Sequence, residues 1–416
     1  MKSTILFVDH DRGCSGATVS MEYLIRAFSR AGWKVLVLSP KDPREAARIT
    51  DAGGSVVRVK IPGMKDLALN LHSSNTNSPF RPEGLLDYAK NVIKFFVGTV
   101  VIWRVIRRSH AGLVYANEYV VIQGSVAGFM CGIPSVLHVR SLMLRGAMGL
   151  RRRVLRFLML ACNRRVFAIT RLEAEQIAPS GRRSDKVVVV GEFVDAAEPH
   201  GANRPAWRTR LGIRQEQVLV SMVGGIDPLK GSLEYLRSAG RVRSTRPDTV
   251  FVLAGPGRAG GSREASAYCE ECARHVEALR EAGALIDLGF VDDTRDIMAG
   301  TDILVVPSTL THFSRPVIEA WHYATPVVVS ATDHMRDLVT DGTDGILYSM
   351  DDAGALDSAL LRLIDSKELR LRLGRAGRKK SRDLFDADRN TQLILGYCGD
   401  LLTGTGPGER ARGRPA

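Results

Sequence analysis

The sequence predicts an α/β protein built from two doubly wound domains, each a parallel sheet with helices on both faces. Short apolar runs rich in Val and Ile, such as Ile303–Val306, are typical of strands covered on both faces. These runs alternate with amphipathic helical segments, and the alternation starts again near Val218. A chain of 416 residues, 45% of them hydrophobic, is long enough to bury two or three cores without disulfides.

The first domain opens with a strand, a glycine-bearing turn, a helix and a second strand. The first strand is expected at Ile5–Val8 and the helix from about Thr18, with Met21 and Phe28 on one apolar face. The turn at residues 11–16 can approach a phosphate, although it lacks the full glycine fingerprint of dinucleotide binding. Further strands are expected at Val35–Leu38, Leu113–Tyr115, Pro134–His138, Val166–Thr170 and Val187–Val190, and further helices at Leu85–Arg108, Ile122–Met130 and Arg145–Arg165.

The second domain repeats the pattern and is followed by a terminal helix. Helices are expected from Ser232, from about Pro316, at Leu356–Ile364, at Leu369–Lys380 and, last, at Thr391–Leu402. Strands are expected at Val218–Val223, Val250–Ala254, Leu285–Phe290, Ile303–Val306, Pro326–Val329 and Ile346–Tyr348.

Composition suggests where the domains end. A first domain is expected over residues 1–198, a second over 199–385, and a helix over 386–403 that packs back on the first. The linker is placed at Ala196–Ala206, and the Gly-, Pro- and Arg-rich tail 404–416 is expected to be disordered. The polar loop Pro62–Pro82 is either a binding element or plain disorder.

The net charge of +13 predicts an anionic partner. Nucleotide phosphates and acidic lipid headgroups both fit, whereas nucleic acid is not expected, because the arginines lack interleaved aromatic residues. The six cysteines are scattered, which is typical of a reduced, cytoplasmic protein. Cys269 and Cys272 form a CxxC without a second pair, so no metal site is expected.

Two basic, apolar segments bear on the location of the protein. No stretch reaches the roughly 18–20 uncharged residues of a membrane span, and no signal peptide is expected. Leu85–Arg108 and Arg145–Arg165 instead combine apolar residues with clustered arginines, as helices that lie on an anionic membrane surface do. The alternative is that they are ordinary helices with a solvated basic rim. A cytoplasmic protein, peripheral on the inner face of the membrane, fits the first reading.

A carboxylate stands at a place where α/β sheets bind ligands. Glu319 lies one turn inside the helix that Pro316 begins, after the buried strand Ile303–Val306. Helix N–H groups and strand ends converge at such a point. The alternative is that Glu319 only complements the helix dipole, which is worth about 0.3–1 kcal/mol.

Four stretches resemble motifs of the retaining family-4 glycosyltransferases of the GT-B fold, over about residues 4 to 400. Val223–Gly231 is similar to the strand and loop with a phosphate-binding lysine, and Leu253–Gly257 to a strand end with two glycines. Leu288–Val291 resembles the loop that holds the nucleotide base. Phe313–Val328 matches the acidic signature helix and the strand after it. The resemblance implies two Rossmann-like doubly wound domains facing each other across a cleft.

The resemblance also implies roles for individual residues. Lys230 neutralises the leaving diphosphate, Glu319 accepts hydrogen bonds from the ribose hydroxyls, and His138 approaches the donor sugar. Asn117, Glu118 and Arg140 are expected to contact the acceptor. The remaining positions expected at the donor are Gly16, Gly224, Gly225, Gly255, Phe290, Val291, Thr311, His312, Phe313, Ser314 and Arg315.

The chain departs from the family pattern at two positions. Thr311, followed by His312, replaces the first glutamate of the pair, whose role is to hold hydroxyls of the donor sugar. Gly225 stands where an arginine accompanies the lysine, so one cation is missing at the diphosphate. Arg315 or Arg140 are candidate substitutes.

The implied reaction is transfer of a hexosyl unit from a UDP-sugar or GDP-sugar, without a metal or other cofactor, to a saccharide or lipid-linked acceptor. Cell-surface polysaccharide or glycolipid biosynthesis is the expected setting. Two alternatives remain open, a GT-B sugar-nucleotide epimerase and a degenerate GT-B module that serves as a scaffold in a polysaccharide-synthesis complex.

Overall fold

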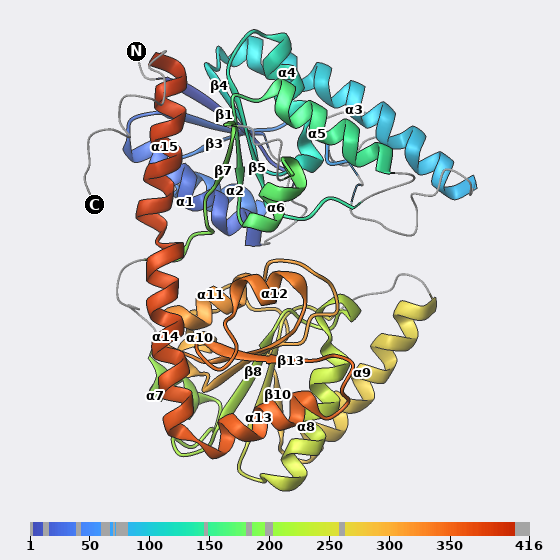
Figure 1. Cartoon of the computed structure of the whole chain (residues 1–416), viewed down its shortest axis with the longest axis vertical. Coiled ribbons are helices and arrows are strands. Elements are labelled where there is room, and N and C mark those ends of the chain that lie inside the picture. The colour runs from blue at the N-terminus through green and yellow to red at the C-terminus, as the bar shows by residue number, and fades with distance from the viewer. Residues whose placement is uncertain are drawn as a thin grey trace. The chain divides into compact units, whose positions relative to one another are not determined.

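The computed structural model describes residues 3–10, 16–38, 43–59, 67–69, 71, 82–144, 149–179, 185–195, 203–257 and 263–403. Five expectations fall wholly or mostly outside these residues: the turn at 11–15, the loop Pro62–Pro82, Arg145 at the start of a basic helix, the linker from Ala196 to residue 202, and the tail 404–416. The chain forms two compact units, residues 1–193 with 387–416, and residues 194–386 (Figure 1).

The first unit contains a seven-stranded parallel sheet in the order β3-β2-β1-β4-β5-β6-β7. Its order reverses between β1 and β4, so the carboxyl ends of these two strands flank a topological switch point, where open α/β sheets bind ligands. The strands are β1 (Thr4–Val8), β2 (Lys34–Leu38), β3 (Ser55–Val57), β4 (Leu113–Ala116), β5 (Ser135–Val139), β6 (Arg165–Ala168) and β7 (Val187–Val189).

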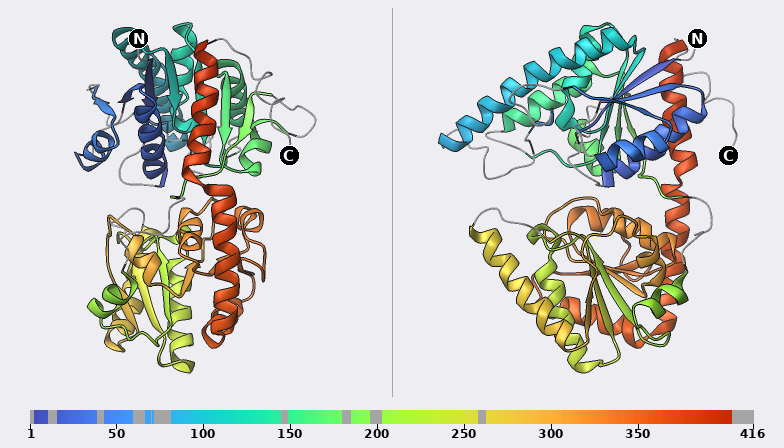
Figure 2. Two further views of the ribbon diagram at one scale, coloured as in Figure 1. Left: turned by 90° about the vertical axis from the view of Figure 1, so that its left-hand side faces the viewer. Right: turned by 180° about the vertical axis from the view of Figure 1, so that it is seen from behind.

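Helices cover both faces of this sheet. One core joins the sheet to α3, α4, α5 and α6, and the other joins it to α1, α2 and α15. The terminal helix α15 lies along α1, and Ile394 and Cys398 on it are buried (Figure 2). The helices are α1 (Gly16–Arg30), α2 (Pro43–Asp51), α3 (Pro82–Ser109), α4 (Gln123–Met130), α5 (Leu150–Cys162), α6 (Arg171–Ile177) and α15 (Ala387–Thr403), with a 3₁₀ turn η1 (Tyr119–Val121) after β4.

The second unit contains a six-stranded parallel sheet in the order β10-β9-β8-β11-β12-β13. Its switch point lies between β8 and β11. The strands are β8 (Leu219–Val223), β9 (Val250–Ala254), β10 (Leu285–Asp287), β11 (Ile303–Val306), β12 (Val327–Ser330) and β13 (Gly345–Tyr348). The helices are α7 (Arg204–Arg210), α8 (Ser232–Thr245), α9 (Arg263–Glu281), α10 (Arg295–Gly300), α11 (Arg315–His322), α12 (Asp333–Leu338), α13 (Ala355–Asp365) and α14 (Lys367–Phe385), with a 3₁₀ turn η3 (Pro228–Lys230). The predicted α/β class with two doubly wound parallel sheets is confirmed.

Several expected elements differ from those observed in their bounds, and for three of them the local reason is clear. The basic helix expected to reach Arg165 ends at Cys162, because Asn163 is extended and Arg165 already pairs with β5 as the first residue of β6. The strand expected to reach Phe290 ends at Asp287, whose Oδ1 accepts the N–H of Gly289 at 3.0 Å in a turn. The end of the expected linker is helical, since α7 begins at Arg204 behind the cap of Asn203.

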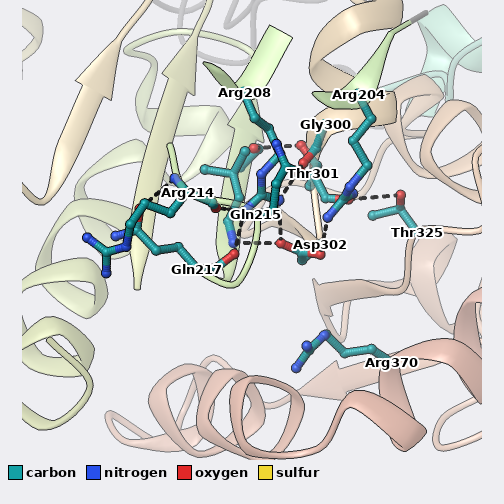
Figure 3. Close-up of polar contacts among 12 residues, drawn as sticks. Arg204, Arg208, Arg214, Gln215, Gln217, Gly300, Thr301, Asp302, Thr325 and Arg370 are labelled. Atoms are coloured by element: carbon teal, nitrogen blue, oxygen red, sulfur yellow. Dashed lines mark hydrogen bonds and ion pairs between the residues drawn. The ribbon is translucent and has the colours of Figure 1, made fainter. Parts of the chain in front are cut away.

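A buried ion cluster fixes α7 to the amino edge of the second sheet (Figure 3). Arg208 is fully buried, and its Nη1 lies 2.9 Å from Oδ2 of Asp302. Nη2 of Arg204 lies 2.6 Å from Oδ1 of the same carboxylate. Oδ2 also accepts the N–H of Leu219, the first residue of β8, at 2.9 Å. The cluster lies at the edge opposite the carboxyl ends of the strands, so its role is structural.

Candidate functional site

Three glycine-bearing loops meet at the carboxyl ends of β8, β9 and β10. The N–H groups of Gly224 and Gly225 both donate to the carbonyl of Ala254, at 2.8 and 3.0 Å. The N–H of Gly255 donates to the carbonyl of Gly289 at 2.7 Å. The loops therefore pack backbone against backbone, beside the switch point of the sheet.

The backbone at Gly225 explains why no arginine stands there. Its φ is +71°, and a Cβ at this position would lie 2.2 Å from the carbonyl oxygen of Pro256. No side chain fits unless the two loops separate. The cation that the family pattern puts at this position is excluded by the way the two loops pack.

Lys230 is held at the switch point by a tight turn. Asp227 caps η3, because its Oδ1 accepts the N–H of Leu229 at 2.8 Å. Gly231 follows at φ +72°, and a Cβ there would lie 1.8 Å from the carbonyl oxygen of Pro307, just after β11. This close approach brings the turn after β8 against the loop after β11.

The Lys230 side chain crosses to that second loop and contacts His312. Its Nζ lies 3.1 Å from Nε2 of His312, while Nδ1 of His312 lies 3.1 Å from the carbonyl oxygen of Leu310. A carbonyl can only accept and an ammonium can only donate, so Nδ1 carries the imidazole proton and Nε2 accepts from Lys230. Thus His312, one of the residues expected at the donor, is joined directly to the predicted catalytic lysine.

Burial shapes the protonation of this pair. Burial, and after it the neighbouring ammonium of Lys230, lower the pKa of His312 to about 4, so the imidazole is neutral at pH 7. Burial also lowers the pKa of Lys230, against the opposing effect of the Asp227 carboxylate. The pair is therefore a partly desolvated cation with a neutral partner, an arrangement that favours an anionic ligand.

Glu319 is paired with Arg315 on α11. Nε of Arg315 lies 2.6 Å from Oε1 of Glu319, one helical turn away, and the two side chains are 12% and 23% exposed. Ser314 precedes the helix and Pro316 occupies its first turn, as the sequence indicates. Arg315 therefore neutralises the carboxylate, and its own contact with a donor stays a prediction.

The other residues expected at the donor differ in exposure. Phe290, in the loop after β10, is 48% exposed, whereas Ser314 is buried. The Phe313 ring packs against Phe385 with centroids 6.0 Å apart. Val291 and Thr311 are half-buried. Each of these residues belongs to a loop or helix start that follows the carboxyl end of a strand.

In the first unit His138 lies inside the protein. Its Nδ1 lies 2.7 Å from Oη of Tyr115 and 3.2 Å from Nη2 of Arg140. Arginine only donates, so Nδ1 accepts and Nε2 carries the proton. Burial and the Arg140 charge hold the pKa of His138 well below its ordinary value. Within the described part of the chain, Nε2 has no hydrogen-bond partner.

Arg140 is the centre of a buried network at the carboxyl edge of the first sheet. It pairs with Glu192, which also accepts from the hydroxyl of Ser20 on α1. Its Nε donates to Oδ1 of Asn117 at 3.0 Å, and Nδ2 of Asn117 donates to Asp9 at 2.9 Å. Arg140 and Asn117 are thus engaged by protein groups, and their contact with an acceptor stays a prediction.

Glu118 is a strained, buried carboxyl next to this network. Its φ is +125°, in a region that residues other than glycine rarely adopt. Its two oxygens accept the N–H groups of Tyr119 and Arg140, at 2.8 and 2.9 Å. Burial raises the pKa of Glu118 to about 7. The contacts favour a role in holding the ends of β4 and β5 together.

Sequence reasoning missed four members of this network: Asp9, Ser20, Tyr115 and Glu192. A signal was present for Asp9, which directly follows the first strand, and none for the others. Gly16 begins α1, and its carbonyl accepts from Ser20 at 2.9 Å. Among the described residues, no group of three or more His, Cys, Asp or Glu side chains is placed to hold a metal ion.

Two family models match the chain, one over each unit. The model described as Glycosyl transferase 4-like domain matches residues 15–191, and that described as Glycosyl transferases group 1 matches residues 203–380. The chain belongs to the family-4 type glycosyltransferases of the GT-B fold. The second match contains Lys230, His312 and Glu319, and the first contains His138.

The curated relatives of this glycosyltransferase align with about half of its chain or less. D-inositol 3-phosphate glycosyltransferase of Salinispora arenicola is 26% identical over 230 residues, 53% of this chain and 49% of the relative. An Escherichia coli enzyme, UDP-Gal:alpha-D-GlcNAc-diphosphoundecaprenol alpha-1,3-galactosyltransferase, is 26% identical over 163 residues, 39% of this chain and 40% of the relative. The chain thus spans half or less of the length of these two relatives.

A solved structure shows the same fold over nearly the whole chain. HepE of Anabaena in complex with UDP-glucose has a TM-score of 0.74 and 19% sequence identity, covering 95% of this chain and 99% of that one. Of the helices that the structure describes, none is long and apolar enough to cross a bilayer.

Proposed function

We propose that this glycosyltransferase moves a hexosyl unit from a UDP-sugar or GDP-sugar to an acceptor hydroxyl, with retention at the anomeric carbon. The observation that carries the proposal is the Lys230 ammonium, held by His312 at the switch point between β8 and β11, beside the glycine loops. Diphosphates bind where a helix N-terminus and a cation converge at the carboxyl ends of strands, and α8 begins at Ser232, two residues after Lys230.

Lys230 has the central role in the proposed reaction. Its ammonium stabilises the negative charge that develops on the departing diphosphate, and this help is greater in the transition state than in the ground state. The departing phosphate oxygen accepts the proton of the acceptor hydroxyl on the same face of the sugar. No protein nucleophile and no metal ion is required for this step.

Glu319 and His138 orient the donor in this proposal. A carboxylate can accept from two neighbouring ribose hydroxyls at once, and the ion pair with Arg315 holds the Glu319 carboxylate in place. His138 is proposed to donate from Nε2–H to the donor sugar. Because Nε2 is buried and the ring is fully enclosed, this contact requires the side chains around His138 to move when the donor binds.

A saccharide or lipid-linked acceptor completes the proposal. The E. coli relative is named for a diphosphoundecaprenol-linked acceptor, a lipid carrier. We extend a lipid-linked acceptor to this chain, with cell-surface polysaccharide or glycolipid biosynthesis at the cytoplasmic face of the membrane as its setting. The basic helices α3 and α5 support a position on an anionic membrane surface.

Nucleotide binding tests the proposal first. Thermal-shift and calorimetric titrations with UDP, GDP and ADP are expected to show binding of UDP or GDP, because a ligand of the native state raises its apparent stability. Donor turnover followed by NMR then reports the anomeric configuration of the product. Conversion of free donor without an acceptor indicates an epimerase instead, and binding of none of the three nucleotides indicates a scaffold.

Lys230→Ala tests the role of the cation. We expect turnover to fall by on the order of 10²–10³-fold, since a charge that stabilises the transition state is lost. Leu229→Ala is the matched control, because Leu229 is 46% exposed on the same turn. Wild-type rates in Lys230→Ala, measured with the nucleotide sugar that binds, contradict the assignment.

A further inference from the structure

Two neighbouring helices of the first unit carry apolar side chains on their outer sides. On α3, Ile93, Phe96 and Val100 are 56%, 63% and 43% exposed. On α5, Leu150, Val154 and Phe157 are 62%, 48% and 69% exposed. Spacings of three and four residues put each set on one stripe of its helix. We call these six residues the α3–α5 stripes.

Both stripes are turned away from the sheet. Ile102 and Ile106 of α3 and Leu155 and Met159 of α5 pack into the core, on the other sides of the two helices. α4 contacts both α3 and α5, and all three cover the same face of the sheet (Figure 1, Figure 2). The stripes therefore lie on the outside of one helical layer. Exposed apolar groups of this size on a soluble surface mark an interaction site.

Most of the net charge of the chain lies in the same part of the sequence. Residues 88–165 contain thirteen Lys and Arg residues and one acidic residue, Glu118, which is buried. When the first residues of α3 are included, Glu83 and Asp87 are added, and residues 82–165 carry a net charge of +10 of the chain's +13. On α5, Arg152 and Arg153 lie directly beside the stripe of Leu150 and Val154. Basic side chains beside apolar ones are typical of helices that lie in a lipid headgroup region.

We propose that the α3–α5 stripes and the arginines beside them bind the surface of a bilayer that contains anionic phospholipids. The apolar side chains enter the headgroup region, and the arginines contact lipid phosphates. A second copy of the chain fits this face poorly, because two surfaces of the same charge repel each other. A nucleic acid fits less well than a bilayer, because four of the six stripe residues are aliphatic and offer no stacking surface for bases: Ile93, Val100, Leu150 and Val154.

The inference deepens the proposed function and rests on it in one respect: a face that binds lipid would bring the first unit to a lipid-linked acceptor. Binding to vesicles requires neither nucleotide nor acceptor. Failure of the membrane inference therefore leaves nucleotide binding untouched, and failure of nucleotide binding leaves vesicle binding untouched.

Co-sedimentation of the full chain with lipid vesicles tests the inference. Vesicles of phosphatidylcholine alone are compared with vesicles of phosphatidylcholine and phosphatidylglycerol, at low and high salt. We expect binding to the anionic vesicles only, weakened by salt because screening shortens the reach of the arginine charges. No sedimentation with anionic vesicles, or equal sedimentation with both kinds, overturns the proposal.

Two pairs of substitutions separate the contribution of the apolar side chains to vesicle binding from that of the arginines. Phe96→Glu with Phe157→Glu is expected to lower the partition coefficient by about tenfold or more. Arg152→Gln with Arg153→Gln is expected to lower it by about three- to tenfold at low salt and less at high salt. The control pair is Leu371→Glu with Leu393→Glu, which makes the same change of charge at side chains 48% and 45% exposed on α14 and α15.

Each outcome decides the question. Binding by the control pair with loss in Phe96→Glu/Phe157→Glu supports the proposal, provided that circular dichroism shows both proteins folded. Equal loss in both pairs overturns it. A dimer in light scattering that Phe96→Glu/Phe157→Glu dissociates also overturns it, because the stripes then form a contact between two copies.

Discussion

At the residue scale, the packing around Gly225 decides which cation lies beside the glycine loops of the second unit. Packing of this loop against Pro256 excludes a second cation there, so Lys230 supplies the charge next to the glycine loops. His312 directs the lysine, because its Nε2 accepts one ammonium hydrogen and leaves the others for a ligand. At the position that departs from the acidic pair, Thr311 is followed by His312, the residue that contacts this ammonium.

Gly225→Ala separates crowding from backbone strain at this loop. Gly212 has the same φ of +71°, but a Cβ there meets nothing within 4 Å. We expect Gly212→Ala to cost about 1 kcal/mol of unfolding free energy through strain alone, and Gly225→Ala about 2–4 kcal/mol, because the clash with Pro256 is added. Urea unfolding followed by tryptophan fluorescence measures both. Equal costs would show that the loops separate freely.

His312 makes the stability of the second unit depend on pH. Its pKa is about 4 in the folded protein and about 6.5 in an unfolded chain, so the unfolded chain binds the proton more tightly. The stabilisation is complete above pH 6.5 and is lost as the pH falls toward 4. His312→Gln keeps an acceptor for Lys230 but does not titrate.

We therefore expect the unfolding free energy of His312→Gln to fall less than that of the wild type between pH 7 and 4.5, by about 1–2 kcal/mol. Chemical unfolding of both proteins at the two pH values measures the difference. Parallel pH dependence in the two proteins contradicts a neutral, buried His312.

At the element scale, the sheets present loops that follow different strands to a common edge. The turn η3 after β8 and the loop after β11 meet because Gly231 approaches Pro307 closely. At the opposite edge, Asp302 fixes α7 through Arg204 and Arg208 (Figure 3). One edge of the sheet thus presents the loops that we propose to bind the donor, and the other edge anchors the first helix of the unit.

Arg208→Met tests that anchor. Arg208 is fully buried and reaches Asp302 together with the carbonyls of Gly300 and Arg214. Its loss leaves Arg204 as the other cation on the partly buried carboxylate and removes a donor from each carbonyl. We expect a loss of about 3–5 kcal/mol in unfolding free energy. Arg204→Met, at a side chain 37% exposed, is the control and is expected to cost about 1 kcal/mol or less. Denaturant unfolding compares the two, and similar costs refute the buried anchor.

At the scale of the whole molecule, the first unit contains both ends of the chain. α15 follows the second unit in the sequence and packs into the core of the first unit, along α1. Helix α15 therefore stabilises strands that include β1, although about 380 residues separate the two elements in the sequence.

Ile394→Ala tests this long-range packing. Ile394 is fully buried against the α1 side of the sheet, and we expect its truncation to cost the first unit about 2–4 kcal/mol. Leu393→Ala, at the adjacent side chain that is 45% exposed, is expected to cost about 0.5 kcal/mol or less. Hydrogen exchange of the amides of β1 and β4 reports the difference. Equal protection in both variants contradicts the packing of α15.

Local pattern predicted many of the elements, because strands buried on both faces and amphipathic helices leave clear periodicities. Helix α6 was missed although Thr170 and Glu173 cap its start, a sequence signal that is readable. The ends of β10 and α5 were misplaced, because a side-chain cap at Asp287 and strand pairing at Arg165 decide them. The spacing of apolar residues along the chain does not reveal the partners of such contacts, so it does not locate the ends of these elements.

The sequence by itself determined the fold class, the family and the identity of Lys230, Glu319 and His138 as site residues to test, because spacing and residue type carry that information locally. Tertiary structure alone decided that His312 holds Lys230, that Gly225 has no room for an arginine, and that Arg140 is enclosed by Glu192 and Asn117. Each of these depends on two chain segments that meet only when the parallel strands bring their carboxyl ends to one edge, and no local pattern encodes that meeting.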